Sequence, residues 1–251
     1  MKRERYLLLL LLILIWQSLS SFHLIPSYKL ASPVEIILGF IDLLTVGVPP
    51  GHFLHHHVLY SLYRVALGYS VAALLAIPLG LLMGWFPRLK GMISPLVEVV
   101  RPIPPLAWIP IAILWFGIGM KSAAFIIFLG AFFPILLNTI AGVLSINPIL
   151  VEAARTLHAR EKDIFYKVLL PGSIPSIFVG MRIGIGVGWM TLVAAEFTGV
   201  KEGFGLGYMI MTARDIQRPD EILAGMLVIG VIGLLIDIAL RATESRVIRW
   251  R

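Results

Sequence analysis

The sequence contains no cysteine, so it forms no disulfide, zinc–thiolate site, iron–sulfur cluster or thiol nucleophile. It is also poor in charge: 14% of its 251 residues are charged, and 59% are hydrophobic. Soluble domains carry about 25% charged residues, which argues against a water-soluble globular enzyme. Disorder is excluded because the chain has too much apolar surface to bury. The composition predicts an all-α membrane protein with several spans of roughly 20 residues.

A nucleotide-binding loop is missing as well. The phosphate-binding pattern Gly-x-x-x-x-Gly-Lys-Ser/Thr is absent, and no Gly-Lys pair occurs anywhere in the chain. The glycine-rich stretch 199–207 follows no predicted strand, so it does not provide such a loop. If the chain transports a solute, its energy comes from another subunit or from an ion gradient.

Six apolar segments predict six spans, at about 6–22, 62–84, 94–117, 122–143, 172–197 and 222–240. The third is interrupted by four prolines between 102 and 110. Irregular backbone at membrane depth is tolerated only where it is buried in protein or lines a wet cavity. Between the first two spans, Ser32, Pro33 and Glu35 predict the start of an amphipathic helix at the outer surface. Residues 198–221 are polar and rich in glycine.

The first apolar segment follows Lys2-Arg3-Glu4-Arg5 and is typical of a signal anchor. A cleaved signal peptide is the alternative, with Ser18-Leu19-Ser20 as the small-residue cleavage site. Both interpretations place the N-terminus in the cytoplasm.

The net charge of +7 would suggest nucleic-acid binding in a soluble protein. Here the distribution of the basic residues indicates how the chain is oriented in the membrane. With the N-terminus inside, 13 Lys and Arg fall on cytoplasmic segments and 5 on external ones. Cytoplasmic loops of membrane proteins carry such an excess. We therefore expect both termini in the cytoplasm, and no nucleic-acid partner.

Residues 152–171 carry the most specific pattern. Glu152-Ala153-Ala154 is followed, at a fixed spacing, by Val168-Leu169-Leu170-Pro171. This segment lies in the predicted cytoplasmic loop after the fourth span, and it resembles the Glu-Ala-Ala (EAA) motif of ATP-binding-cassette (ABC) importer permeases.

Three further segments resemble the nitrate/sulfonate/taurine-type permeases: 101–110 with its prolines, 115–119, and 182–196. The resemblance covers about residues 30–245. It implies the methionine-importer-type permease fold, with five core helices plus an N-terminal one, in the cytoplasmic (inner) membrane. The domains expected are an N-terminal helix at 1–25, an external segment at 26–60, a permease core at 61–245 with its coupling loop at 145–170, and a tail at 246–251.

The resemblance also implies partners: a second copy of the chain, two ABC ATPase subunits, an extracytoplasmic substrate-binding protein and the lipid membrane. It implies no catalytic residue and no cofactor in this chain, since ATP and Mg²⁺ would bind the ATPase. The residues expected to couple to the ATPase are Glu152, Ala153, Ala154, His158, Ala159, Arg160, Glu161, Lys162, Asp163, Ile164, Phe165, Leu170 and Pro171. A short amphipathic helix over 159–166 would form the contact.

One residue departs from the motif, because its glycine is replaced by His158. Glycine permits a sharp turn between two short helices. Histidine adopts positive φ more readily than most residues. We interpret it as a tolerated substitution; a pH-sensing role is the alternative.

Charged residues within predicted spans mark a bundle interior or a cavity. Arg101 and Arg182 would attract an anion, whereas structural ion pairs are the alternative for both, with Glu98 a partner for Arg101. The residues assigned to a translocation path are Glu98, Arg101, Pro104, Pro105, Trp108, Arg182, Trp189, Met190 and Glu196. Glycines at 180, 184, 186 and 188 predict close helix packing in the fifth span.

Two other functions compete with ABC import. His52, His55, His56 and His57 superficially match one histidine box of membrane di-iron enzymes, but the chain has only six histidines and those enzymes use three boxes. We interpret the cluster as a wet loop before the second span, with no metal site. A secondary transporter driven by an ion gradient would need a protonatable path and an internal repeat, and no repeat is evident. The substrate class implied is a small anion such as nitrate or a sulfonate.

Overall fold

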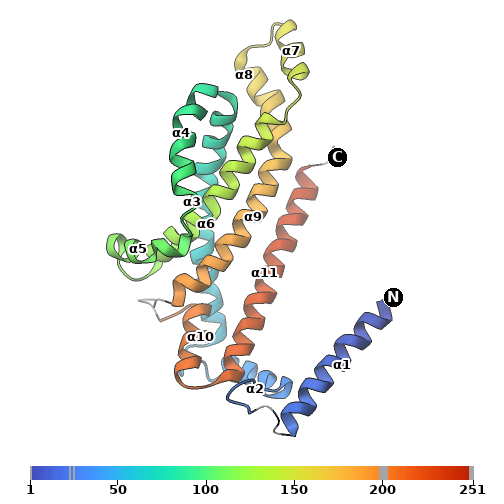
Figure 1. Ribbon diagram of the computed structural model, residues 1–251, viewed down its shortest axis with the longest axis vertical. Coiled ribbons are helices and arrows are strands. Elements are labelled where there is room, and N and C mark those ends of the chain that lie inside the picture. Colours follow the sequence, from blue (N-terminus) through green and yellow to red (C-terminus); the bar gives the residue numbers. More distant parts are fainter. Residues whose placement is uncertain (1, 23, 25, 198–202, 249–251) are drawn as a thin grey trace. The chain divides into compact units, whose positions relative to one another are not determined.

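The computed structural model describes residues 2–22, 24, 26–197 and 203–248 (Figure 1). Residues 199–202 of the glycine-rich stretch, and the tail residues Arg249 and Arg251, lie outside this part of the chain. All regular structure in the described residues is helical, which confirms the predicted all-α class.

The helices follow one another along the chain. They are α1 (Lys2–Ser21), α2 (Pro33–Thr45), α3 (Leu54–Trp85), α4 (Pro87–Val100), the 3₁₀ turn η1 (Pro105–Trp108), α5 (Ile109–Phe116), α6 (Met120–Leu144), α7 (Pro148–Thr156), α8 (Glu161–Ile164), the π-helical turn η2 (Phe165–Leu169), α9 (Leu170–Phe197), α10 (Leu206–Asp215) and α11 (Pro219–Val247).

Four of these helical stretches are long and apolar enough to cross a membrane: α3, α6, the continuous stretch Glu161–Phe197 and α11. The pair α4 and η1–α5 makes a fifth if it is counted as one span, although it is bent by 83°. This is the segment in which clustered prolines predict a break. The first predicted span coincides with α1, which is not among the four helical stretches long and apolar enough to cross a membrane within the described residues.

The chain divides into two compact units. One comprises residues 1–62 and 196–232, and the other comprises residues 63–195 and 233–251.

The core of the second unit forms between α3 and α6. Small residues recur every four positions along α3, at Gly68, Ala72, Ala76, Gly80 and Gly84. A Cβ on Gly80 would lie 2.7 Å from Cβ of Thr139, so no larger residue fits there. Close approach of this kind is the usual way in which membrane helices associate. The expected packing of glycines on α9 is also observed for Gly184, which faces Ile135 of α6.

In the first unit, α2 begins as the sequence predicts. The Ser32 hydroxyl accepts the Glu35 N–H at 3.1 Å, and the Glu35 carboxylate accepts the Ser32 N–H at 2.6 Å. These two bonds form a capping box, which satisfies backbone donors that a helix start leaves open. Ile36, Gly39 and Leu43 are buried along one side of the helix.

Two elements differ from the prediction. Helix α3 begins at Leu54, so His55, His56 and His57 lie in its first turns, and the interpretation of these three residues as a loop was wrong. Helix α10 was not predicted, and it occupies part of the polar, glycine-rich stretch 198–221. Its glycines at 205 and 207 signal a loop in the sequence, but Gly205 precedes the helix and Gly207 packs in its buried side.

Candidate functional site

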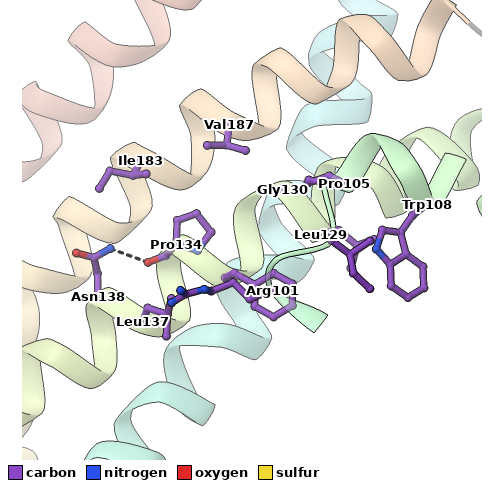
Figure 2. A pocket seen from close by; sticks show the side chains of 12 residues that line it. Arg101, Pro105, Trp108, Leu129, Gly130, Pro134, Leu137, Asn138, Ile183 and Val187 are labelled. Atoms are coloured by element: carbon purple, nitrogen blue, oxygen red, sulfur yellow. Dashed lines mark hydrogen bonds between the residues drawn. The ribbon is translucent and has the colours of Figure 1, made fainter. Parts of the chain in front are cut away.

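The break between α4 and η1 opens a pocket in the second unit. Helix α4 ends at Val100, and the helical chain resumes at Pro105 after Arg101, Pro102, Ile103 and Pro104. Pro102 and Pro104 supply no backbone N–H, so the α-helix cannot continue through them. The resulting cavity has a volume of about 360 Å³. Figure 2 shows its lining: Arg101, Ile103, Pro105, Trp108, Leu129, Gly130, Phe133, Pro134, Leu137, Asn138, Ile183 and Val187.

Arg101 is the one charged residue in this lining. Its guanidinium makes no hydrogen bond or ion pair within the described part of the chain, and it is not paired with Glu98, which is exposed on α4. The other lining residues apart from Asn138 are apolar. A cation without a partner in an apolar pocket favours binding of an anion.

Asn138 was not identified from the sequence. Its side-chain amide donates to the carbonyl oxygen of Pro134 at 2.8 Å (Figure 2). The amide oxygen makes no hydrogen bond to any described residue. Because Pro134 has no N–H, the Gly130 carbonyl also lacks its usual helical donor. In the sequence, Pro134 within an apolar segment was the only indication that the backbone hydrogen bonding of α6 is interrupted next to Asn138.

Of the residues assigned to a translocation path, three line this pocket: Arg101, Pro105 and Trp108. Pro104 precedes η1 directly. The predicted path residues between positions 101 and 108 therefore lie together at the break between α4 and η1.

The remaining path residues lie elsewhere. Arg182 of α9 forms ion pairs with Asp237 and Glu244 of α11. Trp189 is buried, with its indole nitrogen 3.1 Å from the position of a Cβ on Gly233. Met190 is 76% exposed. Their contribution to a path stays a prediction.

Glu196 belongs to the other unit and is fully buried. Its carboxylate accepts the hydroxyl of Ser61 at 2.8 Å and the backbone N–H of Gly207 at 2.8 Å. A carboxylate near a helix N-terminus is favoured by the helix dipole.

The EAA segment forms two helices joined by a tight turn. Helix α7 covers Glu152, Ala153 and Ala154, and α8 begins at Glu161. The helix predicted over 159–166 therefore starts two residues later, and it continues through η2 into α9 instead of ending at Tyr166. No helix-stop residue follows Tyr166 directly, and the next proline, Pro171, lies within the continuous helical stretch Glu161–Phe197.

His158 lies in the turn with φ of 59°, which is the left-handed conformation that glycine adopts most easily. Arg155 stabilises the same turn: its Nε contacts the Glu161 carboxylate at 3.3 Å, and its guanidinium lies 5.9 Å from the centre of the Trp85 ring. The histidine thus keeps the backbone geometry that the motif's glycine would have.

Large apolar side chains are exposed on this otherwise polar segment. Leu157 is 83% exposed, Ile149 is 67% exposed and Tyr166 is 64% exposed. Tyr166 also lines a groove of about 400 Å³, together with Leu82, Trp85, Phe86, Glu161, Lys162 and Phe165. Large apolar side chains exposed on a polar segment are candidates for contact with a partner protein.

The histidine cluster provides no metal site among the described residues, where no group of three His, Asp or Glu side chains could hold an ion. Instead, the rings pack on one another and on Phe204, with 4.4 Å between the ring centres of His52 and Phe204.

Comparison with known proteins agrees with this architecture. Residues 76–249 match the family described as binding-protein-dependent transport system inner membrane component. A putative ABC transporter permease protein of Methanocaldococcus jannaschii is 42% identical over 96% of this chain and 89% of its own length. The taurine transport system permease protein of Escherichia coli is 38% identical over 96% of this chain and 87% of its own.

A solved structure shares the fold. The chain superposes on an inward-facing structure of the MetNI methionine ABC transporter with a TM-score of 0.68, covering 77% of this chain and 95% of the other at 22% identity. This bears out the predicted methionine-importer-type fold. The chain therefore belongs to the family of binding-protein-dependent transport system inner membrane components, and it is a membrane permease subunit of the ABC-transporter type.

Proposed function

We propose that this permease moves a small anion into the cytoplasm, and that a separate ATPase drives the movement. The observation that carries the proposal is Arg101, an unpaired guanidinium at the break of a bent apolar helix pair. Broken helices at membrane depth line substrate sites in many transporters. Arg101 is exposed at the mouth of this pocket in the single chain. A cation within a membrane-spanning segment is expensive and is retained where it has a function.

The remaining walls of the pocket fit a small anion with a short apolar body. Trp108, Leu129 and Val187 offer apolar contact, and Asn138 offers one N–H and one carbonyl oxygen. Taurine, named for the relative from Escherichia coli, carries a sulfonate group. We extend the nitrate and sulfonate class to this chain on that likeness and on the single positive charge of the pocket.

The ATPase is proposed to bind the exposed apolar face of α7 and the following turn. Leu157 and Ile149 would enter a groove on the partner, and Arg160 and Lys162 would surround them with charge. ATP and Mg²⁺ would bind the ATPase subunit, since this chain has no phosphate-binding loop. Closure of two ATPase subunits would then push the coupling segments of two permease copies and rock their helices between inward- and outward-facing states.

In this arrangement both termini lie in the cytoplasm, and an external binding protein delivers the substrate. The orientation is supported by the 13 basic residues on cytoplasmic segments against 5 on external ones.

The test is uptake by proteoliposomes that contain the chain, its ATPase and its binding protein. Wild type should take up radiolabelled taurine, another sulfonate or nitrate only with ATP present, and purified permease alone should hydrolyse no ATP. Arg101→Gln should raise the half-saturating substrate concentration by about tenfold or more, the effect of losing a hydrogen bond to a charged group. Arg101→Lys keeps the charge, so its half-saturating concentration should lie between those of wild type and Arg101→Gln. Arg246→Gln, which removes an exposed cation in the last turn of α11, is the matched control.

ATP-free uptake under an imposed ion gradient would instead establish a secondary transporter. Unchanged uptake by Arg101→Gln would remove Arg101 from the path.

A further inference from the structure

Three consecutive backbone N–H groups at the start of α10 bind three side chains from elsewhere in the chain. The pairs are Gly205 with Nδ1 of His57 at 3.0 Å, Leu206 with Oγ of Ser61 at 2.9 Å and Gly207 with Oε2 of Glu196 at 2.8 Å. His57 and Ser61 are one turn apart on α3, and Glu196 is in the last turn of α9. We call these three side chains the α10 clamp.

The clamp is one buried network. All three side chains are fully buried, and the Ser61 hydroxyl also contacts both oxygens of Glu196, at 2.8 and 3.0 Å. Nε2 of His57 lies 3.2 Å from the carbonyl oxygen of His52. Nδ1 of His57 lies 3.0 Å from the Gly205 carbonyl oxygen as well as from the Gly205 nitrogen. We assign the proton of the neutral ring to Nε2, which donates to the His52 carbonyl, so that Nδ1 accepts the Gly205 N–H; a proton on Nδ1 would instead be donated to the Gly205 carbonyl. Each polar group of the clamp is thus used.

Helix α10 depends on this network because it has no cap of its own. A helix start leaves its first N–H groups open, and a local Ser, Thr, Asp or Asn usually accepts one of them. The N-cap position here is Gly205, which has no side chain. With only ten residues, α10 is also too short to be stable alone. Its position is therefore set by α3 and by the end of α9.

The other end of α10 is held by Arg218. This guanidinium binds Asp42 of α2 and Asp220 at 2.7 Å each, and it lies 3.1 Å from Glu221. Hydrogen bonds to Asp220 and Asp42 raise the pKa of Arg218 above its ordinary value, so its charge is kept at every working pH. Both ends of α10 are thus tied to longer helices.

One of those helices leads directly to the coupling segment. The chain is helical without interruption from Glu161 to Phe197. Glu161 belongs to the predicted ATPase contact, and Glu196 belongs to the α10 clamp. Contiguous helices and hydrogen-bond networks are the structures that carry coupling between distant sites.

We infer that His57, Ser61 and Glu196 are positioning residues that transmit movement of this helix to α10 on the external side, and thereby link the ATPase cycle to the external binding protein. The inference rests on the proposed function, because it needs an ATPase and a binding protein as partners. The inference adds a route within one permease chain along which movement passes from the ATPase contact to the external binding protein.

The test uses the reconstituted complex of permease, ATPase and binding protein. The readout is the ratio of ATP hydrolysis with loaded binding protein to hydrolysis without it, at equal amounts of assembled complex. Ser61→Ala should lower this ratio about 2- to 10-fold, the range that corresponds to one lost net hydrogen bond. Ser61→Thr restores the hydroxyl and should recover the ratio. Thr212→Ala is the matched control, because the Thr212 hydroxyl donates only within α10, to the carbonyl of Tyr208.

His57→Phe provides a second, independent variant, since it keeps a ring of similar size and removes the acceptor for Gly205. If both Ser61→Ala and His57→Phe assemble and keep the wild-type ratio, the inference is overturned. A lowered ratio that Ser61→Thr restores and Thr212→Ala does not reproduce supports it. A wild-type complex without ATP-dependent uptake would overturn the proposed function itself, which separates the two failures.

Discussion

Arg182 of α9 forms an ion pair with Asp237 of α11, with 3.9 Å between Nε and Oδ1. Glu244, two turns further along α11, binds the same guanidinium. Asp237 is shared with Arg241 at 2.7 Å. Two cations, Arg101 and Arg182, look alike in the sequence, but only Arg182 is neutralised by neighbours in the described residues.

The first prediction concerns this pair. Arg182→Gln should lower the stability of the permease by about 1 kcal/mol, because the side chains are about one-third exposed and solvent weakens their attraction. It should leave the half-saturating substrate concentration unchanged. Thermal unfolding in detergent and uptake in proteoliposomes measure the two quantities. An increase in half-saturating concentration as large as that for Arg101→Gln would place Arg182 in the path.

The second prediction concerns the turn in the EAA segment. His158→Gly should leave stability and uptake close to wild type, since glycine adopts a φ of 59° without strain. His158→Val should cost about 1–3 kcal/mol, because a β-branched residue is strained in this conformation. ATP-driven uptake and binding of the ATPase subunit are the measurements. His158→Gln is the control for loss of the ring. If His158 senses pH, this variant should change the pH profile of uptake.

The third prediction compares two glycines on α9. A Cβ on Gly184 would lie 2.9 Å from Cγ1 of Ile135 and 3.0 Å from the carbonyl oxygen of Ala131, whereas a Cβ on Gly186 meets nothing within 4 Å. Gly184→Ala should therefore destabilise the chain by about 1–3 kcal/mol through overpacking. Gly186→Ala should be neutral or slightly stabilising, because alanine favours a helix. Equal melting temperatures for the two variants would contradict the packing of α9 on α6.

The fourth prediction concerns the capping box of α2. Ser32→Ala should destabilise the chain by about 1 kcal/mol. The Ser32 backbone N–H lowers the pKa of Glu35 below its ordinary value. A lowered carboxyl pKa gives stability that is complete above the ordinary value and is lost as the pH falls through the folded-state value. Wild type should thus be more stable than Glu35→Gln at pH 7, and the difference should vanish in acid. A pH-independent difference would show that the charge of Glu35 plays no part.

The sequence allowed prediction of those features that depend on neighbouring residues. The break after Arg101 follows from Pro102 and Pro104, and the start of α2 follows from Ser32, Pro33 and Glu35. The turn at His158 follows from the EAA spacing, since the histidine occupies the place of its glycine.

Features that depend on distant residues were missed. Gly205 and Gly207 signal a loop locally, and the acceptors that stabilise α10 lie about 145 residues earlier, on α3. Asn138 was missed because one amide in an apolar run has no pattern of its own. The pairing of Arg182 was left open for the same reason, as Asp237 is 55 positions away and no periodicity relates the two.

The α10 clamp also restricts how the length of the chain can change. An α-helix turns by about 100° per residue, so one residue added between His57 and Ser61 would move their two acceptors onto different sides of α3. Insertions and deletions among related permeases should therefore avoid positions 57–61.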